Sequence, residues 1–204
     1  MKILNKINKF KKNHKKEKQN LPTLFFFTDR KQFNDIFTII KKLPQNSAII
    51  IREYDLNQKE RLKFAKKIVK IAKYKNLLTF AAKSLKLAVQ AKTDGVHFSD
   101  NDKSWMKYLF YKKFNQKFFL SCSCHNQKSI NKIKEFPINF AFLSPIFDTK
   151  THPNQKAIGH RNLIKLQNHQ SAIYALGGVN ENNIKLLQNR KIKGVGAISL
   201  LTKI

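Results

Sequence analysis

The hydrophobic positions of the chain fall into short apolar runs that alternate with longer amphipathic stretches. In these stretches apolar residues recur every three or four positions, which is the period of a helix with one buried face. The clearest stretch is 58–74, where Leu62, Ala65, Ile68 and Val69 form one stripe among lysines. Further helices are expected at 32–43, 84–92, 103–114, 127–135, 161–168 and 181–189.

Eight of the short apolar runs have the length and the flanking residues of buried strands. They cover 23–28, 48–54, 77–82, 95–99, 118–125, 140–147, 172–177 and 194–200. Strands that alternate with helices indicate a parallel sheet. Eight such units within 204 residues predict an α/β fold, a small TIM (β/α)8-type barrel. A doubly wound open sheet is the structural alternative.

The expected eighth strand ends near residue 200, so the predicted barrel lacks its last helix. The outer faces of its first and last strands would then need another cover. Residues 1–11 are expected to supply it as a helix, because Ile3, Ile7 and Phe10 have helical spacing. A homodimer interface and a disordered basic tail are the alternatives. We expect a basic N-terminal segment, 1–20, followed by one barrel domain, 21–204.

The net charge is strongly positive but does not change this picture. Lys and Arg number 41 against 12 Asp and Glu, giving a formal charge of +29. Such a charge attracts nucleic acids, but the arginines that bind bases and phosphates are scattered, so we expect no nucleic-acid partner. No apolar run reaches the roughly 20 residues of a membrane span, and the N-terminus does not resemble a secretory signal. Two cysteines give no disulfide framework, and we expect a cytoplasmic protein without a membrane partner.

Scarce residue types gather where the expected strands end, which is where barrel enzymes carry their active sites. Half of the acidic residues lie there, and three histidines join them: Asp29, Glu53, Asp55, Asp100, Asp102 and Asp148, with His97, His125 and His152. This clustering favours a functional face, although loops are polar in any protein.

Glycine follows the same pattern after the seventh strand and in the eighth. Gly177 and Gly178 are expected to let backbone N–H groups approach a phosphate, although a glycine can also simply end a strand. Cys122 and Cys124 could join His125 in a metal site, but strand alternation favours two cysteines that pack as small apolar side chains.

Five segments carry motifs in a recognisable order. They read Asp94-Gly-Val-His-Phe-Ser-Asp-Asn-Asp102, Ser121-Cys-Ser-Cys-His125, Phe142-Leu-Ser-Pro-Ile-Phe-Asp-Thr-Lys-Thr-His152, Tyr174-Ala-Leu-Gly-Gly-Val179 and Gly194-Val-Gly-Ala-Ile-Ser199. These segments resemble motifs of the thiamine phosphate synthase/TenI family, namely D-G-V-H-L-G-Q-x-D, G-x-S-x-H, G-x-G-P-(I/V)-(F/Y)-x-T-x-T-K, (A/G)-I-G-G-(I/V) and G-V-A-V-(V/I)-S. The matches span about residues 47–200, and together they are specific.

The resemblance implies a transferase that joins a pyrimidine-methyl diphosphate to a thiazole phosphate, giving thiamine phosphate and pyrophosphate. It implies that Arg52 contacts the diphosphate and that Ser123 hydrogen-bonds to the substrate or the diphosphate. It implies Mg²⁺ as a cofactor, with Asp102 as a ligand. The remaining binding residues would be Thr149, Thr151 and His152, and then Gly177, Gly178, Ile198 and Ser199, which would present backbone donors to the thiazole phosphate. An ion pair, a strand hydroxyl and turn structure are the ordinary alternatives for Arg52, Ser123 and the two threonines.

Several positions depart from the family pattern. The second-strand motif Q-(L/I)-R-x-K loses its Gln and Lys, and Tyr54 takes the place of that Lys. The third-strand Asp, a metal ligand in the family, is replaced by Lys83. Asp100 stands for a Gln, and His152 for a Lys. Either Lys83 replaces the metal as a fixed cation, or Asp100 joins Asp102 as a displaced ligand. We expect weak Mg²⁺ binding unless a diphosphate bridges the ion.

Three classes of function therefore stay open, and synthase-like transfer leads. A thiazole tautomerase would lack the family's usual histidine, whose position is Pro145, although His125 could serve as a substitute acid or base. A catalytically inactive relative that binds a phosphorylated thiazole is the next alternative. A basic nucleic-acid-binding protein is the last.

Overall fold

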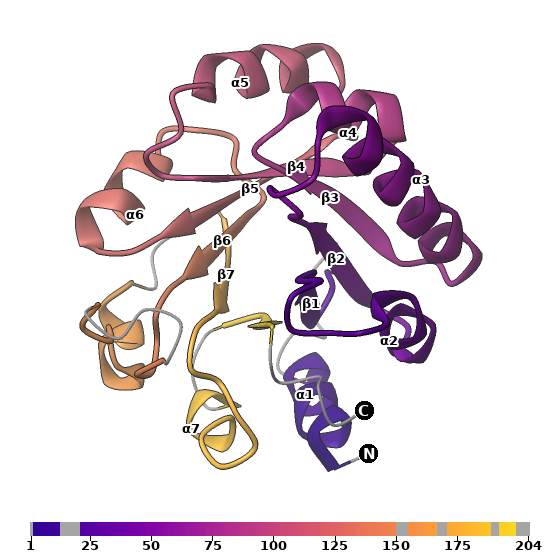
Figure 1. The fold of residues 1–204 in the computed structure, drawn as a ribbon. Helices are drawn as coiled ribbons and strands as arrows, with labels where there is room; N and C mark the ends of the chain where they lie inside the picture. Colours follow the sequence, from indigo (N-terminus) through magenta and orange to yellow (C-terminus); the bar gives the residue numbers. More distant parts are fainter. Residues whose placement is uncertain (1, 13–20, 150–154, 167–170, 189–191, 199–204) are drawn as a thin grey trace.

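The strands form a closed barrel in which every strand has two neighbours. The structure, a computed structural model, describes residues 2–12, 21–149, 155–166, 171–188 and 192–198. Within them, eight parallel strands follow one another in chain order, and β1 pairs with β8 (Figure 1). The strands are β1 Leu24–Phe27, β2 Ser47–Ile51, β3 Leu78–Ala82, β4 Gly95–Ser99, β5 Phe119–Cys124, β6 Phe140–Leu143, β7 Ala172–Ala175 and β8 Gly194–Ala197. The expected barrel is confirmed, and the open sheet is excluded because it would have two unpaired edges.

The helices lie outside the strands and mostly match the expected stretches. They are α2 Ile36–Lys42, α3 Gln58–Tyr74, α4 Leu85–Ala91, α5 Trp105–Phe114, α6 Gln127–Ile133 and α7 Lys185–Gln188. The helix expected at 161–168 is instead a 3₁₀ helix, η1 His160–Leu166. Asn180 accepts the backbone N–H groups of Asn182 and Asn183, which forms a turn and delays α7 to Lys185.

Two strands end earlier than expected, for local backbone reasons. β6 stops before Pro145, which has no N–H to donate to the ladder. Residues beyond it still pair with the loop after β7, since Ile146 N–H donates to Leu176 O at 3.0 Å. β2 stops at Ile51, close to Glu53, whose φ of 25° lies outside the range of a strand. Both strand ends therefore turn into the loops that carry the expected site.

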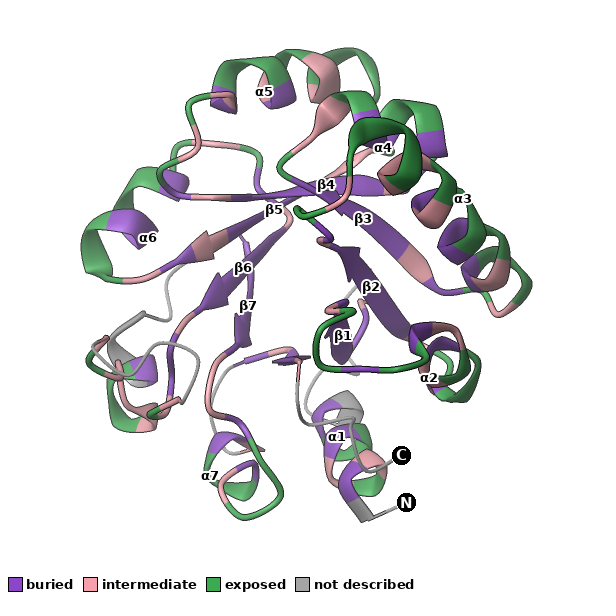
Figure 2. Ribbon diagram, in the orientation of Figure 1, coloured by how far each residue is buried: buried purple, intermediate pink, exposed green. Residues whose placement is uncertain are grey.

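Aromatic side chains fill the inside of the barrel. Phe25, Phe80, Phe140, Phe142 and Tyr174 are all fully buried there. Their rings meet mostly edge to face, with centroids 4.8 Å apart for Phe25 and Tyr174. The buried strands and the exposed outer sides of the helices are plain in Figure 2. Because the interior is packed, ligands have access only at the ends of the barrel.

The N-terminal helix α1, Lys2–Lys12, covers the gap in the outer ring between α7 and α2 (Figure 1). Ile3, Ile7 and Phe10 are buried in the same apolar cluster as the outer side chains of β1 and β8. Lys6 donates to Glu181 O at 2.9 Å, and Gln188 donates to Lys6 O at 2.8 Å. The expected N-terminal helix is therefore confirmed, while the domain boundary at residue 20 borders residues that the structure does not describe.

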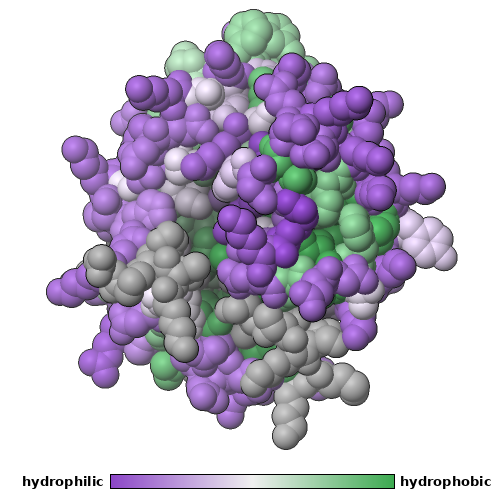
Figure 3. All heavy atoms as spheres, viewed as in Figure 1, coloured by the Kyte–Doolittle hydropathy of each residue, from purple (hydrophilic) through white to green (hydrophobic). Residues whose placement is uncertain are grey.

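The surface is hydrophilic over most of the face seen in Figure 3, as the lysine content requires. The exposed apolar side chains include Met106, Phe110 and Phe114, which all lie on α5. In the part of the chain that the structure describes, no helix has the length and apolarity needed to span a membrane.

Candidate active site at the carboxyl ends of the strands

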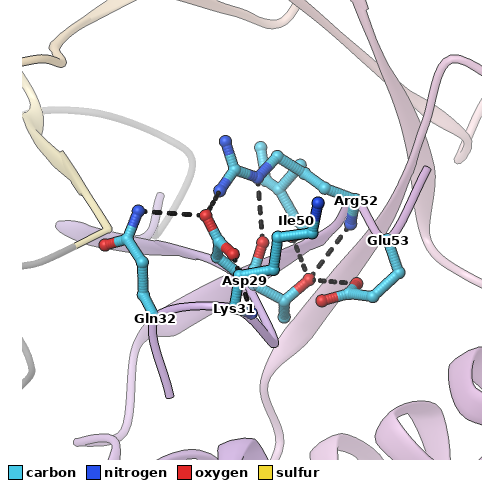
Figure 4. A network of polar contacts seen from close by, with 7 residues as sticks. Asp29, Lys31, Gln32, Ile50, Arg52 and Glu53 are labelled. Carbon is cyan, nitrogen blue, oxygen red and sulfur yellow. Dashed lines mark hydrogen bonds and ion pairs between the residues drawn. The ribbon is translucent and has the colours of Figure 1, made fainter. Parts of the chain in front are cut away.

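Arg52 is held in one orientation where β1 and β2 end (Figure 4). Its Nε donates to Thr28 O at 2.9 Å, and its Nη2 donates to Asp29 at 3.1 Å. Asp29 is fixed in turn, because it also accepts from Lys31 N–H and from the Gln32 amide at 3.0 Å. The remaining guanidinium nitrogen, Nη1, has no hydrogen-bond partner among the described residues. Arg52 is thus preorganised, with one fork left for an anion.

Glu53 follows Arg52 in the chain, and its carboxyl group is held by a neighbouring hydroxyl. Its carboxyl group accepts from Thr28 Oγ1 at 2.6 Å, while its Oε1 is buried without a partner in the described chain. Burial raises the pKa of Glu53 above its ordinary value, against the effect of the Thr28 hydrogen bond. A cavity of about 250 Å³ lies between the loops that follow β1 and β2, and residues 28–31 and 52–55 line it. Arg52 is part of its wall.

His97, in the middle of β4, and Ser123, near the end of β5, form a hydrogen-bonded pair. His97 Nε2 is 3.0 Å from Ser123 Oγ, and Nδ1 is 3.0 Å from Ser121 Oγ. Since Ser121 Oγ also contacts Val96 O at 3.3 Å, it donates there and accepts from Nδ1–H. His97 Nε2 then accepts from Ser123. Burial, and after it the charges of Arg52 and Lys83, lower the pKa of His97 to about 3, so this imidazole is neutral.

The two candidate metal ligands point to different partners. The carboxyl group of Asp100 is buried and accepts from Ser129 Oγ, and its backbone carbonyl accepts from Lys132 Nζ at 2.8 Å. Asp102 instead accepts from Ser104 N–H at 2.7 Å and from Tyr108 O–H at 3.1 Å.

These residues do not fit a Mg²⁺ site. Among the described residues, no group of three or more His, Cys, Asp or Glu side chains could hold a metal ion. A hard cation needs several oxygen ligands around one point. Here the carboxylate of Asp100 is buried against Ser129, and the carboxylate of Asp102 accepts hydrogen bonds from Ser104 and Tyr108.

Lys83, directly after β3, and Tyr54, in the loop after β2, contact each other. The ammonium of Lys83 lies 5.4 Å from the centre of the Tyr54 ring, and the guanidinium of Arg61 lies 5.2 Å from it. Arg61 Nη2 donates to Ala82 O at 2.7 Å, which ties α3 to the end of β3. Lys83 itself has a left-handed backbone, with φ of 56°.

His125 has a defined orientation and an available nitrogen. Its Nδ1 lies 2.8 Å from Ser144 O, so Nδ1 carries the proton and donates it to that carbonyl. Gln155 approaches the same nitrogen at 3.3 Å. Nε2 has no hydrogen-bond partner within the described ranges, and it is the nitrogen that could accept a proton.

Gly177 and Gly178 make a tight turn against the loop that follows β6. Both have positive φ, 85° and 68°. A Cβ at Gly178 would lie 2.5 Å from the carbonyl oxygens of Phe147 and Asp148. In the described chain, neither glycine N–H is used in a hydrogen bond, so both can serve an anion. Ile198 directly follows β8, and Thr149 is the last described residue of the sixth loop. Thr151, His152 and Ser199 lie outside the described residues.

Cys122 and Cys124 do not reach the site. Both are fully buried in the apolar layer outside the barrel. The hydrogen bond that the Cys122 thiol donates to Cys124, together with burial, raises the pKa of Cys122, which therefore stays protonated. The packing interpretation of these cysteines agrees with this geometry.

Sequence reasoning missed the roles of two residues. His97 was grouped only with other polar residues at strand ends, and its orientation of Ser123 depends on hydrogen bonds across β4 and β5. Tyr108 lies on a helix, and its hydroxyl reaches Asp102 from six positions along the chain. An alternation rule could have put His97 and Ser123 on the inner face, but nothing in the sequence indicates the Tyr108 contact.

Comparison with known proteins points to one family. A family model described as thiamine monophosphate synthase matches residues 24–201. A protein of Aquifex aeolicus (strain VF5), provisionally named thiamine-phosphate synthase 2, is 29% identical over 88% of this chain and 97% of its own length. Thiamine-phosphate synthase of Prochlorococcus marinus subsp. pastoris is 30% identical over 86% of this chain, which spans 50% of that protein.

Solved structures agree in fold. Thiamine phosphate pyrophosphorylase from Pyrococcus furiosus superimposes with a TM-score of 0.75 at 18% identity, covering 88% of this chain and 86% of that one. The family model spans nearly all of the barrel, from the start of β1 to beyond β8. The chain belongs to the thiamine monophosphate synthase family.

Proposed function

We propose that the protein is a thiamine phosphate synthase-like transferase of thiamine biosynthesis. In this reaction the bond between the methylene carbon of the pyrimidine and the diphosphate oxygen breaks, and the diphosphate leaves with the electron pair. The thiazole nitrogen forms the new bond to that methylene carbon. Family membership and relatives named as thiamine-phosphate synthases support the assignment.

One observation carries the proposal: the barrel mouth offers two separate sets of anion donors. Arg52, directly after β2, has one guanidinium nitrogen, Nη1, without a hydrogen-bond partner among the described residues. After β7, the backbone N–H groups of Gly177 and Gly178 are likewise unused in the described chain. Two substrates that each carry phosphate need two such sets. Preorganised donors also stabilise the charge that develops on a leaving diphosphate.

The remaining site residues take binding roles in this proposal. Ser123 would donate its hydroxyl proton to a diphosphate oxygen, for which it has to release its hydrogen bond to His97 Nε2. Thr149, Thr151 and His152 contact substrate from the sixth loop, and Ile198 and Ser199 complete the thiazole phosphate site. Asp100 and Asp102 have no role in this proposed reaction, because their carboxylates do not come together as one metal site.

A tautomerase-like activity is the second candidate, and His125 favours it. Its Nδ1–H is tied to Ser144 O, which leaves Nε2 as an acceptor in the described structure. Such a histidine can move a proton on a thiazole. Binding without catalysis is the remaining possibility for the same phosphate site. Homodimerisation and a cytoplasmic location stay predictions from the sequence.

Product detection tests the proposal. Purified protein is incubated with both substrates, and thiamine phosphate and pyrophosphate are quantified over time. We expect the two products in equal amounts. An Arg52→Gln variant should lose at least about 90% of the rate, since it removes a charge-assisted contact to the leaving group. Turnover of a thiazole phosphate alone, with no coupled product, would instead support the tautomerase.

A further inference from the structure

The two largest departures from the family pattern meet in space. Tyr54 ends the second-strand motif, Lys83 follows β3, and they are far apart in sequence. In the structure the Lys83 ammonium lies 5.4 Å from the Tyr54 ring centre, a distance at which the ring attracts a cation. The same ring receives the Arg61 guanidinium at 5.2 Å. The two replacements are therefore one local arrangement that gathers positive charge at the mouth.

The backbone directs Lys83 and keeps it in place. Its φ of 56° is left-handed, and its N–H donates to His97 O at 2.7 Å, which ties the strand end of β3 to β4. The side chain is exposed. Its charge is felt at His97, where it acts in the same direction as the charge of Arg52. The register of β2 and β3 pairs Ile51 with Ala81, so Arg52 and Lys83 leave neighbouring strands at nearly the same level of the barrel.

No acidic group neutralises Lys83 within the described residues. Asp29 pairs with Arg52 at 3.1 Å, and Asp55 pairs with Arg30 at 2.9 Å. Asp102 is occupied by Ser104 and Tyr108, and Asp100 is turned into the wall. The three N–H donors of the ammonium are therefore available for a ligand.

We propose that Lys83, held by Tyr54, takes the place of a divalent metal ion and makes diphosphate binding by this protein metal-independent. The ligand class is a diphosphate monoester, and the inference rests on the proposed function for its substrate. The ammonium and the Arg52 fork together supply two positive charges to the diphosphate. When the carbon–oxygen bond breaks, the electron pair stays on the diphosphate oxygen, and these cations stabilise the added charge without any proton transfer.

Inorganic pyrophosphate is the probe, because it needs no thiazole and no turnover. Calorimetric titrations of the full chain are run in EDTA and in millimolar Mg²⁺. We expect the two dissociation constants to agree within about threefold for the wild type. Lys83→Met should weaken binding in EDTA by at least about tenfold, and Lys83→Arg should keep most of it. Lys83→Asp should bind pyrophosphate only when Mg²⁺ is added, since a carboxylate can hold the ion.

Lys92→Met is the matched control. Lys92 is also exposed and left-handed, with φ of 58°, but it lies at the other end of α4 as the C-cap. The same loss of charge there should leave pyrophosphate binding within about twofold of the wild type. Circular dichroism of each variant identifies any that fail to fold. If Lys83→Met does not fold, the pyrophosphate affinity of Lys83→Arg in EDTA is the test of the cation at position 83.

The outcomes separate this inference from the proposed function. Pyrophosphate binding by the wild type only with Mg²⁺, or binding that Lys83→Met leaves unchanged, would overturn the role of Lys83 even if thiamine phosphate is formed. Metal-free binding that depends on Lys83, without any thiamine phosphate formed from the two substrates, would uphold the diphosphate site and count against the transferase.

Discussion

Glycine at position 178 is required for two separate reasons, and one can be tested against the other. Its φ of 68° strains any L-residue, and an added Cβ would lie 2.5 Å from two backbone carbonyl oxygens. Gly159 shares only the first reason, since it has φ of 80° but its nearest neighbour to a Cβ is 3.8 Å away. The pair therefore separates backbone strain from steric contact.

We expect Gly178→Ala to displace the sixth loop and to lower the free energy of unfolding by roughly 3 kcal/mol. Its affinity for thiazole phosphate should fall at least about tenfold, because the N–H donors move. Gly159→Ala should cost only about 1 kcal/mol and leave affinity within about twofold. Calorimetry and urea unfolding measure both. Equal effects of the two substitutions would refute a phosphate site at Gly178.

At the scale of single elements, α1 covers the outer side of the first and last strands. Phe10 is fully buried in the cluster shared with β1 and β8, whereas its neighbour Lys9 is exposed. The helix thus seals the seam between the first and last strands. Its contribution should appear as stability of the whole barrel, since the seam cannot open locally without exposing the core.

Phe10→Ala is expected to lower the free energy of unfolding by about 3–5 kcal/mol, the usual cost of removing a buried aromatic ring. Lys9→Ala should change it by less than about 0.5 kcal/mol. Denaturant unfolding measures both, and size-exclusion chromatography shows whether the uncovered seam promotes association. A Phe10→Ala variant as stable as Lys9→Ala would mean that α1 does not cover the barrel in solution.

At the scale of the whole molecule, stability is expected to depend on pH through His97. Its pKa in the fold is about 3, well below the ordinary value of 6.5, chiefly because it is buried. Between these values the unfolded chain binds more protons than the folded one, so stability rises with pH. Acidification through this window should therefore destabilise the barrel, by up to about 1.4 kcal/mol per pH unit.

His97→Gln isolates this effect, because it keeps a hydrogen-bonding side chain that does not titrate. Urea unfolding at about pH 6.5, 5.5 and 4.5 should give a steeper loss of stability for the wild type than for the variant. Glu53, with its raised pKa, acts in the opposite direction but contributes equally to both proteins. Parallel pH profiles would show that His97 is accessible to protons in the fold.

The sequence predicts most of the barrel, because strand and helix periods are local. The expected 95–99 and 58–74 coincide with β4 and α3. Arg52 and Gly178 could also be placed near strand ends, since Arg52 directly follows β2 and Gly178 lies three residues after β7. The relation of Asp100 to Asp102 could not, because two residues of one loop turn to partners on different helices. The contact between Lys83 and Tyr54 likewise depends on the neighbouring position of β2 and β3.

The position of α1 also has a consequence for how the protein is made. The hydrogen bond from Gln188 to Lys6 joins residues 182 positions apart, so the helix that is synthesised first finds its partners among the last elements. At common rates of translation, roughly ten to forty seconds pass between them. Throughout that interval the nascent chain presents Ile3, Ile7 and Phe10 without their native cover, next to a cluster of lysines. The seam between β1 and β8 therefore cannot be covered by α1 until β8 and α7 have been synthesised.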